Sequence, residues 1–171
     1  IARRVRELNV YCEIHPFNVS IEKIESFSPK GIILSGGPAS IYETNAPLAD
    51  RKILDLRLPV LGICYGMQYL THVLGGIVAK ATDREYGNAA MTIEDNRDLF
   101  HGFGLSDQET VWMSHGDRID RLPEGFAALA SSKNSPIAAM ADTSKKIFGV
   151  QFHPEVAHTP EGHRILKNFL F

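Results

Sequence analysis

Short apolar segments alternate with amphipathic ones along the chain, and this alternation predicts an α/β fold. Residues 31–35 and 60–63 are almost entirely apolar, which is typical of parallel strands that are buried on both faces. Stretches with helical period lie between and after them, and shorter apolar runs follow. The pattern therefore predicts a mostly parallel central sheet with helices on both faces, and extra short antiparallel strands after residue 77.

The apolar and amphipathic periods give the bounds of the expected elements. Helices are expected at residues 1–8, 20–27, 48–56, 65–74 and 159–171. Strands are expected at residues 10–14, 31–35, 60–63, 77–81, 89–93, 110–113, 126–131, 136–141 and 147–150. The polar stretch 83–87 is expected to form a surface loop, and Thr159 is expected to cap the last helix.

The first expected helix has no strand before it, although in an α/β chain each helix normally follows its own strand. We therefore expect a single domain, residues 1–171, that lacks its first N-terminal strand. The composition is globular, with 44% apolar and 22% charged residues. A net charge of −2 gives no basic field for nucleic acid. The sequence shows no signal peptide and no apolar run of about 18 residues, the length that would span a membrane.

Cys64 lies between a predicted strand and a predicted helix, in the pattern Gly62-x-Cys64-x-Gly66. This pattern is typical of a nucleophile elbow, in which two glycines allow a sharp turn and the nucleophile sits at a helix N-terminus. The helix dipole there favours a thiolate. The alternative is a structural cysteine between two packing glycines. The chain has only two cysteines, which is no disulfide framework and fits a reducing, cytoplasmic setting.

His153 and Glu155 follow the apolar strand expected at 147–150. Alternate residues that leave a strand point the same way, so these two side chains can act as a base and its orienting partner. His115 is a rival base. The paired glycines Gly36 and Gly37 follow another strand, where backbone N–H groups can stabilise an oxyanion, unless they form only a turn.

Three motifs resemble the class I, triad-type glutamine amidotransferases: Gly62 to Gln68, Gly149 to Glu155, and Ser35 to Pro38. Trp112 to Asp117 and Arg84 to Gly87 are similar, more narrowly, to the amidotransferase domains of GMP synthases. The resemblance covers nearly the whole chain. It implies a three-layer, flavodoxin-like fold, and hydrolysis of L-glutamine to glutamate and ammonia through Cys64, His153 and Glu155.

The resemblance also implies the remaining site residues. Gly37 and Tyr65 would donate the oxyanion N–H groups. The glutamine-binding residues would be Gly36, Gly37, Gln68, Ser114, His115, Gly116 and Asp117. Asp117 could bind the substrate ammonium, or instead cap a helix that begins near Arg118. Gln68 lies one helical turn after Cys64 and is otherwise a solvated helix residue.

The ammonia needs an acceptor, and no glycine-rich nucleotide loop occurs in this chain. The resemblance implies an ATP-pyrophosphatase or synthetase partner, a domain or a subunit, that binds XMP and uses ATP and Mg²⁺. No cofactor and no metal are expected in the chain itself, since clustered ligand residues are absent. The alternatives are an amidotransferase for anthranilate or CTP synthesis, a cysteine hydrolase of glutamyl substrates, and a non-enzymatic protein that shares the elbow. The last of these would not need His153, Glu155 or Gln68.

Overall fold

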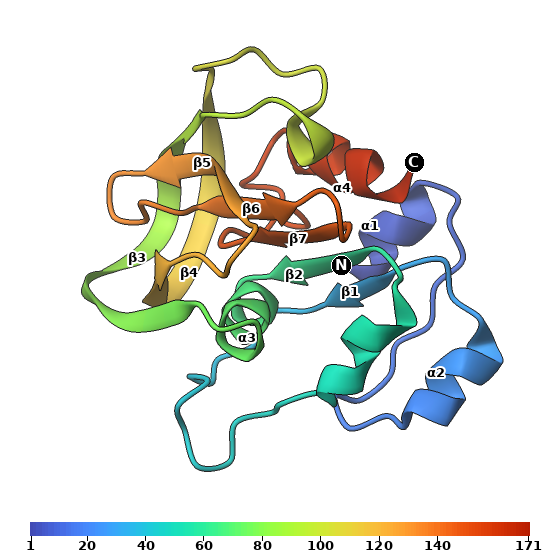
Figure 1. Cartoon of the computed structure of the whole chain (residues 1–171). Coiled ribbons are helices and arrows are strands. Elements are labelled where there is room, and N and C mark those ends of the chain that lie inside the picture. The colour runs from blue at the N-terminus through green and yellow to red at the C-terminus, as the bar shows by residue number, and fades with distance from the viewer.

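One mixed sheet of seven strands forms the centre of the molecule, in the order β1-β2-β7-β6-β5-β3-β4 (Figure 1). The computed structural model describes the backbone of residues 1–171 and all side chains except those of 81–84. The strands are β1 (Ile32–Leu34), β2 (Val60–Ile63), β3 (Ile77–Ile93), β4 (Gln108–Arg121), β5 (Ala127–Ser132), β6 (Ala139–Asp142) and β7 (Ile147–Val150). The helices are α1 (Ala2–Glu7), α2 (Ile21–Phe27), α3 (Tyr65–Val73) and α4 (Gly162–Leu170), with 3₁₀ turns η1 (Arg51–Leu56) and η2 (Asp98–Phe100).

The sheet is α/β in type, but it is not mostly parallel as the sequence predicted. Only β1 with β2 and β2 with β7 pair in parallel, whereas the four other pairings are antiparallel. A parallel pair needs a crossover of a dozen or more residues. Residues 143–146 are too short for one, so β6 and β7 pair antiparallel.

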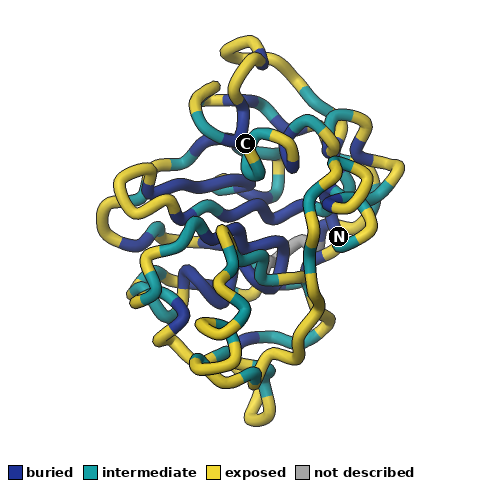
Figure 2. Tube along the Cα trace, turned by 90° about the vertical axis from the view of Figure 1, so that its right-hand side faces the viewer, coloured by how far each residue is buried: buried dark blue, intermediate teal, exposed yellow. Residues whose placement is uncertain are grey.

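Two apolar cores lie on opposite faces of the sheet. Leu61 and Ile63 of β2 pack in the same cluster as Ile165 of α4. Val60, which points the other way from the same strand, packs in the cluster that contains Met67 of α3. The buried residues follow the central strands, and the exposed ones form the outer loops (Figure 2). The carboxyl ends of β1, β2 and β7 are thus supported on both faces.

The predicted loop at 83–87 is instead part of β3, a single strand of 17 residues that runs from 77 to 93. Glu85 is buried, whereas Tyr86 is 63% exposed. The side chains of Asp83 and Arg84 lie outside the described residues. The prediction was wrong because Glu85 has polar partners in the interior. Its charge interrupts the apolar pattern of the sequence, but the strand continues through it. β4 is also long, and it includes Arg118, where a helix was expected.

Three further predictions differ from the structure. Residues 10–14 form no strand, because a groove of about 790 Å³ separates this segment from β1 and leaves it no strand to pair with. The helix expected at 48–56 is the shorter 3₁₀ turn η1. Thr159 does not cap α4, which begins at Gly162, because its hydroxyl donates to the His153 carbonyl and accepts from the Trp112 amide.

The turn from β2 into α3 brings backbone against backbone. A Cβ at Gly62 would lie 2.6 Å from the carbonyl carbon of Gly66, and a Cβ at Gly66 would overlap the Leu34 carbonyl oxygen. Atoms of the main chain cannot move aside as a flexible side chain can. These two glycines are therefore required by the close approach of α3 to β1 and β2.

We expect Gly66→Ala to lower the free energy of unfolding by more than about 3 kcal/mol, above the usual cost of an overpacked core. Differential scanning fluorimetry and soluble yield of the full-length protein measure this. Gly75→Ala is the control, because a Cβ there meets nothing within 4 Å and only the φ of +88° opposes it, at a cost of about 1–2 kcal/mol. Equal loss for both variants would contradict the argument.

Candidate active site

Cys64 occupies the turn between β2 and α3 in a backbone conformation that non-glycine residues rarely adopt. Its φ is +52° and its ψ is −107°. Such a conformation costs about 1–3 kcal/mol and persists only where the surrounding packing and hydrogen bonds fix it. Its N–H donates to the Val150 carbonyl at 2.8 Å, and its carbonyl accepts the amides of Met67 and Gln68. The strained turn sets the thiol at the N-terminus of α3, as the elbow pattern predicts.

His153 lies beside Cys64, at the end of the segment that leaves β7. A Cβ on Gly36 would lie 3.0 Å from His153 Cε1 and 3.4 Å from Cys64 Cβ, so Gly36 lies next to both side chains. His153 Nδ1 lies 2.9 Å from Glu155 Oε1. The His153 backbone is held on both sides, since its N–H donates to the Trp112 carbonyl and its carbonyl accepts from Thr159. The structure thus brings Cys64, His153 and Glu155 together.

The electrostatics of this group favour a protonated His153. Hydrogen bonds from its ring to Cys64 and to Glu155 raise the pKa of His153 to about 10, against the opposing effect of burial. Burial works against ionisation of Glu155, but the hydrogen bond to His153, a backbone hydrogen bond and the charge of His153 together outweigh burial and lower the pKa of Glu155. At neutral pH the His153 imidazolium therefore stands between the Glu155 carboxylate and the Cys64 sulfur.

Two further groups contact the Cys64 sulfur. The Ser114 carbonyl lies 3.5 Å from Sγ, and the Gln151 side-chain amide donates to Sγ at 3.7 Å. The carbonyl suits a thiol, whereas the Gln151 amide and the His153 imidazolium suit a thiolate. Charge-assisted hydrogen bonds are the stronger ones, and the imidazolium donor is of this kind. Sequence reasoning missed Gln151, although it precedes His153 by two residues on the same segment.

The candidate oxyanion donors lie beside the elbow. A Cβ on Gly37 would lie 3.9 Å from Tyr65 Cγ, so the Gly36–Gly37 loop reaches the start of α3. Tyr65 is the first residue of α3, where backbone N–H groups have no acceptor within the helix. Gly37 and Tyr65 are therefore close neighbours on one side of Cys64.

Gln68 and Asp117 contact each other through main-chain and side-chain atoms. Gln68 is buried, and its Nε2 donates to the Asp117 carbonyl at 3.1 Å. The Asp117 carboxylate accepts from Ser40 Oγ at 2.6 Å. Asp117 therefore does not cap a helix, and Gln68 is no solvated helix residue.

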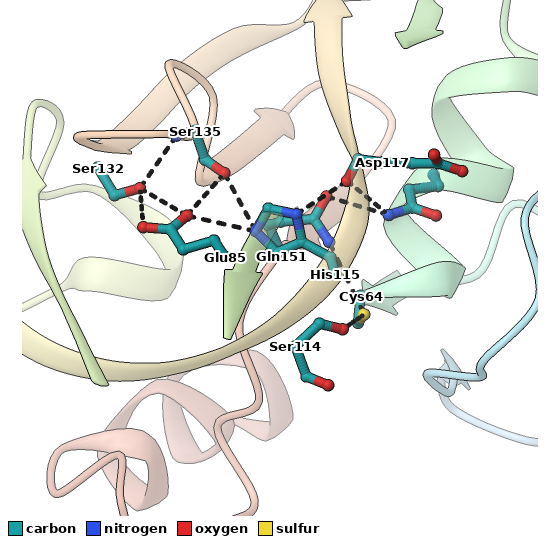
Figure 3. Close-up of polar contacts among 9 residues, drawn as sticks. Cys64, Glu85, Ser114, His115, Asp117, Ser132, Ser135 and Gln151 are labelled. Carbon is teal, nitrogen blue, oxygen red and sulfur yellow. Dashed lines mark hydrogen bonds and ion pairs between the residues drawn. The ribbon is translucent and has the colours of Figure 1, made fainter. Parts of the chain in front are cut away.

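His115 is not placed to serve as the base for Cys64. Its Nδ1 lies 2.9 Å from the Asp117 carbonyl, and its Nε2 lies 3.2 Å from Ser135 Oγ and 3.3 Å from Glu85 Oε2. Both ring nitrogens are thus engaged away from the sulfur (Figure 3). Burial lowers the pKa of His115, while the Glu85 carboxylate opposes this shift. Of the two candidate histidines, only His153 joins the Cys64 and Glu155 group.

The model of the family described as glutamine amidotransferase class-I matches residues 1–171. This chain belongs to the class I glutamine amidotransferases. It is 54% identical over its full length to the GMP synthase [glutamine-hydrolyzing] of Acetivibrio thermocellus and 53% identical to that of Brachyspira hyodysenteriae. It spans 33% of each of these two relatives, about a third of their length.

Solved structures of amidotransferases share this fold. A candidate GMP synthase subunit from Thermoplasma acidophilum superposes with a TM-score of 0.89 at 35% identity, over 98% of this chain and 83% of that one. A glutamine amidotransferase of Thermotoga maritima gives 0.72 at 25% identity, over 97% and 72%. Among the helices described, none has the length and apolar character to cross a bilayer. The described His, Cys, Asp and Glu residues form no group of three that could hold a metal.

We expect Glu155→Gln to lower the pKa of His153 by about 1–3 units from its value near 10, because a neighbouring carboxylate stabilises the imidazolium by that amount. Loss of activity at alkaline pH then begins at lower pH in the variant. An NMR titration of the His153 ring and the pH dependence of glutamine hydrolysis measure the two effects.

The control is Glu161→Gln, which removes a half-buried carboxylate six residues after Glu155 in the chain. His153→Ala should cost more activity than Glu155→Gln, since it removes the group that we expect to transfer the proton, and such a group is typically worth about 10²–10⁴-fold. The opposite order of the two defects would show that the roles are misassigned.

Proposed function

We propose that this chain is the glutaminase part of a GMP synthase. It hydrolyses L-glutamine to glutamate and ammonia, and the ammonia serves the ATP-dependent amination of XMP to GMP. The grouping of Cys64 on the strained elbow with His153 and Glu155 is the observation that carries the proposal. Relatives named GMP synthase, at 51–54% identity, support the choice of product. A reducing cytosol keeps the thiol available, so the proposal places the reaction there.

The first half of the reaction forms a thioester. In the proposed mechanism Cys64 attacks the side-chain amide carbon of glutamine as the thiolate, with the His153 imidazolium beside it. The amides of Gly37 and Tyr65 hold the tetrahedral oxyanion. The imidazolium of His153 gives its proton to the departing nitrogen, and ammonia leaves as the carbonyl reforms.

The second half returns the enzyme to its starting state. Neutral His153 now takes a proton from water, and the resulting hydroxide attacks the thioester. Collapse of the second tetrahedral intermediate releases glutamate and the Cys64 thiolate, while His153 keeps the proton. Glu155 holds the ring orientation and stabilises the imidazolium in both halves.

The proposed glutamine pocket lies between the Gly36–Gly37 loop, Gln68 and the segment Ser114 to Asp117. Asp117 supplies a negative charge for the substrate ammonium, and its neighbour Ser40 orients that carboxylate. The Ser114, His115 and Gly116 contribution is a main-chain wall, since the His115 ring points to Glu85. Gln68 contributes through its side-chain amide, whose nitrogen also donates to the Asp117 carbonyl.

The acceptor for ammonia is proposed to be a synthetase domain or subunit that binds XMP, ATP and Mg²⁺. The chain spans about a third of its curated relatives, and this leaves room in such proteins for the second activity. Amination of another acceptor, as in anthranilate or CTP synthesis, and hydrolysis of other glutamyl substrates are the alternative functions. Product analysis in the presence of each acceptor separates them.

We also propose that the groove beside β1 receives one more parallel strand of a flavodoxin-like sheet. The groove is lined on one side by residues 10–15 and on the other by Gly31 and Ile33. β1 is an edge strand that pairs only with β2. A further strand would satisfy the backbone of both sides.

We expect Cys64→Ala to abolish glutamine-dependent GMP formation by the full-length synthase and to leave ammonia-dependent formation largely intact. Cys64 makes ammonia but takes no part in its use. Cys12→Ala is the matched control, since Cys12 is the other free cysteine and lies outside the site. An electrophilic glutamine analogue should label the Cys64 peptide in mass spectrometry. Equal loss of both activities, or labelling of a peptide without Cys64, would contradict the proposal.

A further inference from the structure

A buried polar cluster lies next to the active site and has no role in the chemistry above. Glu85 of β3 and His115 of β4 are directly opposite each other in the antiparallel register. Their side chains are 9% and 1% exposed. Ser132 Oγ and Ser135 Oγ each lie 3.1 Å from the Glu85 carboxylate, and Ser135 also contacts His115 Nε2. Burial of a carboxylate is costly unless it is hydrogen-bonded, and here both serine hydroxyls donate to Glu85.

The Asp117 carbonyl fixes the direction of the hydrogen bonds that lead from this cluster. A carbonyl oxygen can only accept, so His115 Nδ1 must carry a hydrogen, whatever the protonation state of the ring. For the same reason Gln68 must present its NH₂ group to this oxygen. The Glu85 cluster thus fixes the His115 ring, which donates to the Asp117 carbonyl. The carbonyl in turn fixes the orientation of the Gln68 amide.

The same logic reaches the sulfur. Gln68 Nε2 also lies 3.4 Å from Gln151 Oε1, so Gln151 accepts with its oxygen and turns its NH₂ group to Cys64 Sγ, 3.7 Å away. Gln151 is fully buried, so its side-chain amide depends on protein partners for its hydrogen bonds. Figure 3 shows the chain of contacts from Ser132 and Glu85 to the sulfur.

We propose that Glu85 and His115 are positioning residues that act through Asp117, Gln68 and Gln151 to aim an amide N–H at the Cys64 thiolate. The inference rests on the proposed role of Cys64 as the nucleophile. Gln151 stabilises the thiolate in a different way from His153: it offers a hydrogen bond without a proton to give away. The ionisable groups around Cys64 are His153 and Glu155 after β7, and His115 and Asp117 on β4.

The test is the rate at which iodoacetamide alkylates Cys64 in the full-length protein, followed by mass spectrometry of the Cys64 peptide between pH 5 and 9. This readout needs no glutamine, so it is independent of whether glutamine is the substrate. Gln151→Met keeps the volume and removes the donor, and we expect about tenfold slower alkylation at neutral pH, with a midpoint about one pH unit higher. Glu85→Ala should slow it about three- to tenfold.

The double variant decides whether Glu85 acts through Gln151. If it does, Glu85→Ala has no further effect in the Gln151→Met background, whereas independent losses multiply and overturn the proposal. Glu94→Ala is the matched control, because Glu94 accepts from Ser131 at the surface as Glu85 does from Ser132 in the interior. It should leave alkylation unchanged.

A second variant guards against a failure of Glu85→Ala to fold. Ser135→Ala removes a milder contact to both Glu85 and His115, and circular dichroism checks its structure. A few-fold slower alkylation in this variant, absent in the double variant with Gln151→Met, supports the proposal. Wild-type alkylation in folded Ser135→Ala or Gln151→Met overturns it. Glutamine turnover adds a separate arm, in which kcat should fall more than KM rises.

Discussion

The site depends on one steric constraint, the backbone-to-backbone approach of the first turn of α3 against β1 and β2. No Cβ fits at Gly62 or Gly66, so α3 can pack onto the sheet immediately after Cys64. The short path forces Cys64 into a φ of +52°, which it would not adopt on its own. Because the strain sits at the residue between the two glycines, local packing determines where the thiol points, and α3 supplies the free amides beside it.

The elbow and its partners could be predicted from sequence because each of them is local. Cys64 with its two glycines, and His153 with Glu155, are short patterns whose geometry depends on one turn or one strand end. The Gly36–Gly37 loop likewise follows directly from the end of an apolar strand. Only the sheet order, in which β2 lies between β1 and β7, brings these three segments together, and a buried parallel strand was already indicated at two of them.

Glu85 and Gln151 could not be found in the same way, since their surroundings come from distant parts of the chain. Glu85 contacts residues 30 to 50 positions away, and a charge without visible partners looks like a loop residue. The same error divided β3 in two. Residues 10–14 gave the converse error, because their apolar pattern suits a strand but no strand lies within reach to accept their hydrogen bonds. In both cases the presence or absence of a long-range partner overrode the local pattern.

The protonation of His153 changes the order of events that the sequence alone suggested. A base that must take the thiol proton during attack would work best with a pKa near the working pH. At a pKa of about 10 the ring is protonated at neutral pH, so it is ready as an acid for ammonia, and in the proposed mechanism the thiol proton is lost before the attack. That arrangement requires a thiolate that is stable before the substrate reacts. The His153 imidazolium also interacts with Glu155, so it supplies only part of this stabilisation. A neutral N–H donor such as Gln151 can hold the thiolate without competing for the proton, which is why the amide's orientation matters as much as its presence.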